Sequence, residues 1–163
     1  MLRNWLYSYL GNVIGALSTV ILLFWAGIDA QGGGAVGETA VRIAAEKSSL
    51  GAIEAFVRGM FCNALVCLAI WLAMGGRSVM DKIIAIFLPV AAFIVIGFEH
   101  SIANWFFLPF GFLLDNHEAV SFCGAVKNII MVTAGNIVGG AVQVGAVYWF
   151  AYSRKHRMLR RKF

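Results

Sequence analysis

Residues 97–107 read GFEHSIANWFF and place Glu99 beside His100, with long apolar runs on both sides. An ionisable side chain in the middle of a bilayer costs about 2.5–3.5 kcal/mol, so it persists where it has a partner or a function. Gly97, just before the pair, suits a backbone that leaves helical geometry. The stretch therefore predicts an irregular, polar point inside an otherwise apolar segment.

Two apolar runs flank this point, residues 83–98 before it and 101–114 after it. A membrane-spanning helix needs about 20 residues, so each run alone is too short, whereas 83–114 is too long for one straight helix. One discontinuous span accounts for both observations. We expect the break at the acid–histidine pair and the end of the span at Pro109 and Asp115.

The composition is that of an integral membrane protein, because 61% of the 163 residues are hydrophobic and only 13% are charged. Soluble domains carry about 25% charged residues. The net charge of +5 comes largely from residues 154–162, directly after an apolar run. An anionic bilayer surface is therefore the expected partner, and nucleic acid is not. The three cysteines form no CxxC pair and are expected to be packing residues without a disulfide: Cys62, Cys67 and Cys123.

Uncharged runs of spanning length predict an all-α membrane protein with four transmembrane spans, at residues 4–28, 50–74, 83–114 (broken) and 128–153. We expect 1–153 to form one transmembrane region and 154–163 to form a basic cytoplasmic tail. The first span is too long for a secretory signal. Lysine and arginine are in excess in the flanks on the side of the N-terminus, which predicts that both termini are cytoplasmic. The inner flanks contain Arg3, Arg77, Lys82, Arg154, Lys155, Arg157, Arg160, Arg161 and Lys162, and the outer flanks contain Arg42, Lys47, Arg58 and Lys127.

A short motif occurs twice, as GNVIG at residues 11–15 and as GNIVG at residues 135–139. The copies lie in the first and last spans, which run in opposite directions if the spans alternate. One interpretation is an inverted repeat, typical of transporters whose site is built from broken helices. The other is two unrelated faces for close helix packing, formed by Gly11, Gly15, Gly135 and Gly139. On the first interpretation, 4–28 is the last helix of one repeat and 50–153 is a complete second repeat.

Four stretches carry a resemblance to a known family: GNVIGAL (11–17), GMFCNALVCLAIWLAMGGRSVMDK (59–82), LPVAAFIVIGFEHSIANWFFLPFG (88–111) and GNIVGGAVQVGAVYW (135–149). The chain resembles the formate/nitrite transporters, six-helix pentameric channels for formate, nitrite and hydrosulfide. The resemblance implies an incomplete form of their inverted-repeat, aquaporin-like channel fold, a homo-pentamer, and a place in the bacterial inner membrane. It covers the third to sixth helices of the family, and we expect the first two, one of them broken, to be missing. A truncated or split subunit that forms no pore alone is therefore the alternative.

His100 is the residue to which the resemblance assigns the role of pore histidine. A small anion cannot cross an apolar constriction as a bare charge, because desolvating an ion costs far more than desolvating a neutral molecule. An unperturbed imidazole titrates near pH ~6.5, so it could attract the anion as imidazolium or hand it a proton. The alternative is a structural role, in which a neutral ring hydrogen-bonds a carbonyl freed by the break.

Five further residues complete the candidate site. Phe93 precedes the histidine by two helical turns on one face, and the resemblance makes it an apolar gate; the alternative is ordinary packing. Asn104 could hydrogen-bond across the break. Glu99 is expected to point away from the pore and to need a partner, because an unpaired buried carboxylate is costly. Lys47 and Asn63 are the candidate partners, and the resemblance implies a polar network in which the lysine raises the positive potential near the histidine. On the sequence alone, Lys47 is a solvated loop lysine.

The sequence contains no metal-ligand cluster, no nucleophile–base pair and no paired catalytic carboxylates, so we expect neither an enzyme nor a cofactor. GGGAVGETA (32–40) reads as a flexible outer loop, because no GK[ST] follows it as in a phosphate-binding loop. The leading hypothesis is a passive or proton-coupled channel whose partners are small monovalent anions, protons and the lipid bilayer. A haem-binding membrane anchor is a remote alternative, because it needs two mid-membrane histidines and only His100 has that position.

Overall fold

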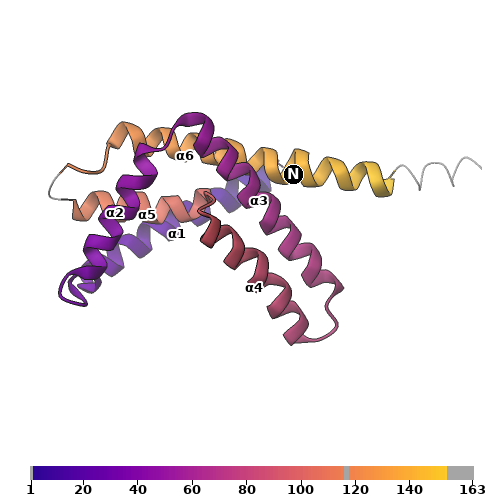
Figure 1. Ribbon diagram of the computed structural model, residues 1–163, viewed down its shortest axis with the longest axis horizontal. Coiled ribbons are helices and arrows are strands. Elements are labelled where there is room, and N and C mark those ends of the chain that lie inside the picture. The colour runs from indigo at the N-terminus through magenta and orange to yellow at the C-terminus, as the bar shows by residue number, and fades with distance from the viewer. Residues whose placement is uncertain (1, 116–117, 154–163) are drawn as a thin grey trace, which may run out of the picture. The chain divides into compact units, whose positions relative to one another are not determined.

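The computed structural model describes residues 2–115 and 118–153, so the predicted tail at 154–163 lies outside the described residues. Every regular element in that part is a helix (Figure 1). The short η1 is a 3-10 helix, and η2 and η3 continue α6 with π-helical geometry. The elements are α1 (Leu2–Trp25), η1 (Ile28–Ala30), α2 (Ala35–Ser49), α3 (Ala52–Gly75), α4 (Val79–Ile96), α5 (Ser101–Leu114), α6 (Phe122–Ile137), η2 (Val138–Ala146) and η3 (Trp149–Ser153).

Within the described residues, four helices are long and apolar enough to cross a membrane: Arg3–Trp25, Ala52–Gly75, Val79–Ile96 and Phe122–Ala151. The apolar α5 is shorter. Large apolar side chains on the long helices are exposed, as lipid-facing residues are; Ile53 and Val95 are 80% and 86% exposed. The predicted all-α membrane fold is confirmed, and helical geometry is interrupted at residues 97–100.

The chain divides into two compact units. The first comprises residues 1–55 and 100–131, and the second comprises 56–99 and 132–163, as far as they are described. The division falls between Glu99 and His100, at the predicted break.

In the first unit, α5 packs against α1 and α2. Ala44 and Leu108 are buried in one apolar cluster, and Val20 and Phe110 are buried in a second. A Cβ added at Gly111 would collide with the Ala40 carbonyl and the Ala44 side chain, so this glycine permits the close approach of α5 to α2. The Trp105 indole N–H also donates to the Tyr9 hydroxyl on α1, at 2.8 Å. Close packing and this bond fix the position of α5.

The expectation of a loop over residues 32–40 is wrong beyond its first three residues. Gly32, Gly33 and Gly34 have positive φ and form the turn, and α2 begins at Ala35. The α2 residues Ala40 and Ala44 are buried, so packing of this small-residue stripe stabilises a helix that its glycine-rich start conceals.

In the second unit, α3 crosses the end of α6 and the start of η2 at very short range. A Cβ added at Gly135 would collide with the Phe56 carbonyl, and one at Gly139 would collide with the Met60 carbonyl. Farther along, the rings of Trp71 and Tyr148 are in contact, with centroids 4.5 Å apart and planes tilted by 37°. The second copy of the repeated motif is thus a close helix-packing face.

The break in the discontinuous span lies where it is predicted. Gly97 ends α4 in the left-handed region, with φ +78°, and its N–H donates to the Ile94 carbonyl at 3.1 Å. The Arg58 guanidinium donates to the Gly97 carbonyl at 3.3 Å, and the Arg58 carbonyl accepts from the Glu99 N–H at 3.4 Å. The polar groups that leave the helix at the break are therefore bonded to α3.

The expected end of the apolar run at residue 114 is confirmed, because α5 ends at Leu114 with Asp115 as its C-cap. The expected contribution of Pro109 to this end is wrong, because the proline lies inside the helix. A proline inside a helix removes one backbone hydrogen bond. Its neighbours Leu108 and Phe110 are buried, so their packing holds α5 in helical geometry past the missing bond.

Candidate functional site

His100 is the N-cap of α5. Its ring nitrogen Nδ1 accepts a hydrogen bond from the backbone N–H of Ala103 at 3.3 Å, which satisfies one of the amides left over in the first helical turn. A nitrogen that accepts carries no proton, so a neutral ring in this arrangement has its proton on Nε2. The histidine thus combines a structural bond at Nδ1 with an N–H donor at Nε2, and protonation of the ring takes place at Nδ1 and displaces the bond from Ala103.

A groove of about 530 Å³ opens beside this histidine. Three of its lining residues carry polar side chains, namely Asn12, Thr19 and His100. The Thr19 hydroxyl donates to the Gly15 carbonyl of its own helix at 2.8 Å. The groove is lined by Gly11, Asn12, Gly15, Ala16 and Thr19 from α1 and by His100, Ile102, Ala103 and Phe106 from α5. The first copy of the repeated motif therefore lies beside the histidine.

A larger hollow of about 670 Å³ lies in the first unit at the ends of α1, α2 and α5. Asp29, Glu38, Arg42 and Asp115 are among its lining residues. The candidate histidine does not line it. We therefore take the smaller groove as the candidate site.

A buried relay of amides joins three helices of the first unit. The Asn104 side-chain amide on α5 donates to the Asn128 side-chain oxygen on α6 at 2.7 Å. The Asn128 amide in turn donates to the Lys47 carbonyl on α2 at 2.9 Å. Asn104 and Asn128 are both 0% exposed. The relay fixes the register of α5 against α2 and α6.

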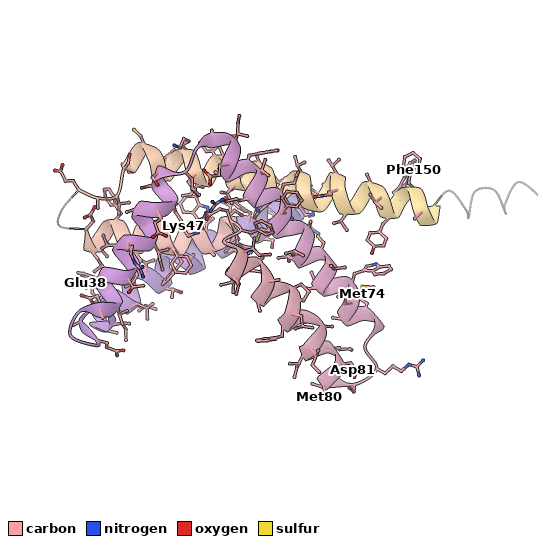
Figure 2. All side chains as sticks on the ribbon, in the orientation of Figure 1. Glu38, Lys47, Met74, Met80, Asp81 and Phe150 are labelled. Atoms are coloured by element: carbon pink, nitrogen blue, oxygen red, sulfur yellow. The ribbon has the colours of Figure 1, made fainter. Side chains whose placement is uncertain are left out.

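Lys47 lies in the last turn of α2 (Figure 2). Its ammonium group lies 5.8 Å from the centre of the Phe107 ring, within the range of a cation–π interaction. The side chain is half-buried. This residue is therefore helical and packed, and the interpretation as a solvated loop lysine is wrong.

In the second unit, Asn136 is the centre of a separate cluster. Its side-chain amide donates to the Gly59 carbonyl at 2.8 Å and to the Glu99 carbonyl at 3.0 Å. Its backbone carbonyl accepts from the Asn63 amide. Glu99 and Asn63 of the predicted polar network thus meet at an asparagine that the sequence analysis assigns only to the repeated motif. Pairing of the Glu99 carboxylate with Lys47 or Asn63 stays a prediction.

Phe93 and His100 do not share one helix, because residues 97–100 are not helical, so the predicted common helix face is wrong. Phe93 lies in α4, and its role as a gate stays a prediction. The Asn104 side chain was predicted to hydrogen-bond across the break. It bonds Asn128 on α6. It does not line the groove beside His100.

Three functional candidates were not predicted from the sequence: Asn12, Asn128 and Asn136. A signal existed for two of them, because Asn12 and Asn136 occupy the same position in the two copies of the motif. Asn128 begins an apolar run, and its partners lie in two distant helices. No group of three or more metal-ligating side chains occurs in the part of the chain that the structure describes.

Four spanning helices, one of them continued across a break into a capped half-length helix, define a multi-pass membrane protein. Comparison with known proteins identifies the family within this class. The family model described as "Formate/nitrite transporter" matches residues 1–150. The chain belongs to the formate/nitrite transporter family.

Two relatives and one solved structure illustrate the similarity. The chain is 39% identical to the formate channel FocA of Escherichia coli strain K12, over an alignment that covers 94% of this chain and 60% of the relative. It is 36% identical to the nitrite transporter NirC of the same strain, covering 96% of this chain and 57% of the relative. A solved structure described as a pentameric formate channel with formate bound superimposes with a TM-score of 0.86 at 36% identity, covering 93% of this chain and 66% of that one.

These relatives are channels and transporters and not enzymes. The chain spans about 60% of the length of the curated relatives it matches. The family model and the relatives therefore establish the family of this chain.

Proposed function

We propose that this chain contributes the anion-conducting pore of a channel for formate, nitrite or hydrosulfide, with His100 as the residue that binds or protonates the anion. The supporting observation is the position of His100 at the start of α5, beside a groove that also contains the side chains of Asn12 and Thr19. The names of the relatives, a formate channel and a nitrite transporter, support the class of substrate.

Chemistry favours a histidine at such a position. The N-terminus of a helix carries a partial positive charge, so the start of α5 attracts an anion. A desolvated anion is costly to carry through an apolar constriction, whereas the neutral acid is not. A histidine that first attracts the anion and then donates a proton converts one into the other, and the same ring serves both steps.

The other candidate residues support this step in the proposed mechanism. Phe93 forms an apolar constriction that excludes water and bare ions. Lys47 adds positive potential for the arriving anion, and Asn104 holds α5 in register through its bond to Asn128. The cluster of Asn63, Glu99 and Asn136 holds the break itself in shape.

The assembly proposed is a homo-pentamer in the plasma membrane with both termini in the cytoplasm. The pentameric relative supports the oligomer, and the excess of cationic residues in the inner flanks supports the orientation. Residues 1–153 form the transmembrane channel region, with 4–28 ending one repeat and 50–153 forming the next.

A second function, a split subunit that conducts only with a partner, is favoured by one observation. A Cβ added at Gly11 or Gly15 meets no described atom within 4 Å, so one side of the groove beside His100 is open in the chain by itself. In this alternative, the pore is completed by further membrane helices.

The experiment is anion uptake by liposomes that contain the purified chain, measured from pH ~5 to ~8 with formate and nitrite. We expect uptake by the wild type to fall as the pH rises, because the imidazolium is lost. His100→Phe removes both the titrating ring and the N-cap. His100→Asn keeps an acceptor for the Ala103 N–H and removes only the titration, so it is the matched control for folding.

Both variants are expected to lose the pH dependence, and only His100→Phe to lose stability. Uptake with an unchanged pH profile in folded His100→Asn would rule out the histidine mechanism. Absence of uptake by the wild type alone, with recovery on adding a two-helix fragment from the unmatched part of the E. coli formate channel, would establish the split subunit.

A further inference from the structure

Another groove, of about 430 Å³, lies along the start of α6 in the first unit. Two neighbouring rows of side chains form it, each with a spacing of four residues, so that the members of a row share one helix face. The exposed apolar row is Phe122, Val126 and Ile130, and the other row, with a cation at its middle, is Cys123, Lys127 and Met131. Together these six residues form the α6 groove. The Phe122 ring also contacts the Phe112 ring of α5, with centroids 6.1 Å apart, which gives the groove a fixed wall at the start of the helix.

Lys127 is the charged group of the α6 groove. Its side chain is half-buried and makes no ion pair or hydrogen bond with any other described residue. It follows the first residue of the spanning helix Phe122–Ala151 by five positions, which is about 7.5 Å along the helix axis. Side chains on a helix tilt toward its N-terminus, so the lysine stem carries the ammonium group toward the membrane surface at which α6 begins. Hydrocarbon offers this group no partner, so its partner comes from the membrane surface.

The α6 groove has its charged and apolar groups in the order in which a lipid carries its headgroup and its acyl chains. The cation is directed toward the membrane surface, and the apolar Ile130 and Met131 lie one turn deeper along the helix. We propose that the α6 groove binds one anionic phospholipid, with its phosphate on the Lys127 ammonium group and one acyl chain along Val126, Ile130 and Met131. Basic side chains near a membrane surface attract anionic headgroups, and the positive end of the α6 dipole adds to this attraction.

Charge and shape together favour an anionic lipid over other occupants of the α6 groove. A free phosphate would pair with Lys127 but leave the apolar part of the groove empty. A zwitterionic lipid would fill the groove, but its own cation competes with Lys127 for the phosphate. A second copy that docks by the same face would bring two lysines together, and like charges across an interface are unfavourable. The lipid site does not involve the transported ion, so its failure is distinguishable from failure of the proposed function.

Cys123 is a natural reporter of occupancy, because it is an exposed free cysteine in the α6 groove, whereas Cys62 is buried. The test measures how fast an uncharged maleimide alkylates Cys123, by mass spectrometry of the peptide that contains it. The full chain is placed in nanodiscs of phosphatidylglycerol or of phosphatidylcholine with the same acyl chains. We expect the reaction to be about fivefold slower in phosphatidylglycerol, the factor that corresponds to one lysine beside an anionic headgroup. Glycerol phosphate added to the phosphatidylcholine discs should not slow it.

Lys127→Gln keeps a long side chain and removes its charge, so most of the difference between the two lipids should disappear, whereas Lys127→Arg should retain it. Arg42→Gln is the matched control, because Arg42 is an exposed cation of α2 that does not line the α6 groove, and it should keep the wild-type difference. Equal rates in the two lipids for the wild type, or an undiminished difference in Lys127→Gln, overturns the proposal. Protection by glycerol phosphate as strong as that by phosphatidylglycerol would assign the site to a free anion. Protection that increases with the number of chains per disc in both lipids would assign it to a second copy, and either result overturns the lipid site.

Discussion

The side-chain amide of Asn136 donates to the Glu99 carbonyl at 3.0 Å, across 37 positions of the sequence, and so holds the peptide that joins Glu99 to His100. The same amide donates to Gly59 on α3 at 2.8 Å. One asparagine on α6 therefore connects α3 to the break in the discontinuous span. The backbone at Glu99 therefore depends on a residue 37 positions away in the sequence.

We predict that Asn136→Leu destabilises the protein by about 2 kcal/mol, because two buried carbonyls lose their donor. Unfolding in mixed micelles of increasing SDS content, followed by circular dichroism, measures the loss. Asn12→Leu is the matched control, since Asn12 has the same place in the other copy of the motif and is exposed. Its effect should stay within about 0.5 kcal/mol. Equal losses in the two variants would contradict the assignment of Asn136 as the centre of the cluster.

The bond between Asn104 and Asn128 should appear as an energetic coupling. Replacing either residue by leucine strands a buried amide, whereas replacing both removes donor and acceptor together. A double-mutant cycle of Asn104→Leu and Asn128→Leu is therefore expected to give a coupling of about 1 kcal/mol, within the range measured for helix–helix hydrogen bonds in membranes. Tyr9→Phe removes the acceptor of a different bond. Combined with Asn128→Leu it should be additive, and a coupling of similar size there would show that the cycle does not report the amide bond.

Gly139→Ala and Gly11→Ala compare one substitution at two positions with different space around them. At Gly139 the new methyl group would collide with the Met60 carbonyl, so the crossing of α3 and η2 must open. We predict a loss of about 1–3 kcal/mol, the usual cost of overpacking. At Gly11 nothing lies within 4 Å, and alanine in a helix is preferred to glycine. The same unfolding assay should therefore give no loss for Gly11→Ala in the isolated chain, and a loss there as large as at Gly139 would contradict the packing described.

The discontinuous span could be predicted because its evidence is local. Each apolar run is too short to cross a membrane, a glycine stands between them, and the ionisable pair follows it at once. The break at Gly97 and the start of α5 after His100 agree with this prediction. The prediction that Phe93 shares a helix face with His100 failed because helical periodicity does not continue through a break in the helix.

The parts that could not be predicted depend on distant contacts. α2 begins in a glycine-rich stretch of low hydropathy, and the burial of Ala40 and Ala44 stabilises it as a helix. The cluster around Asn136 consists of side-chain bonds to main-chain carbonyls 37 and 77 positions away. Main-chain acceptors have no sequence signature, because every residue carries one. The repeat of an asparagine in both copies of the motif was the one sequence signal for Asn136. It marked this residue but not the carbonyl groups that it bonds.

Gly97 ends α4 with a φ of +78°. A side chain in this left-handed region costs about 1–2 kcal/mol for most residues and less for asparagine. A Cβ at this position meets only the Arg58 guanidinium, at an ordinary 3.8 Å, so the cost comes from the backbone and not from a collision. We therefore expect Gly97→Ala to destabilise the protein by about 1 kcal/mol and Gly97→Asn to do so by less. Gly75→Ala is the control, because Gly75 lies in α3 with nothing within 4 Å, and it should be neutral or slightly stabilising in the same SDS titration. If Gly97→Asn is as damaging as Gly97→Ala, the positive φ is not what the glycine provides, and the left-handed end of α4 would have to be abandoned as the cause of the break.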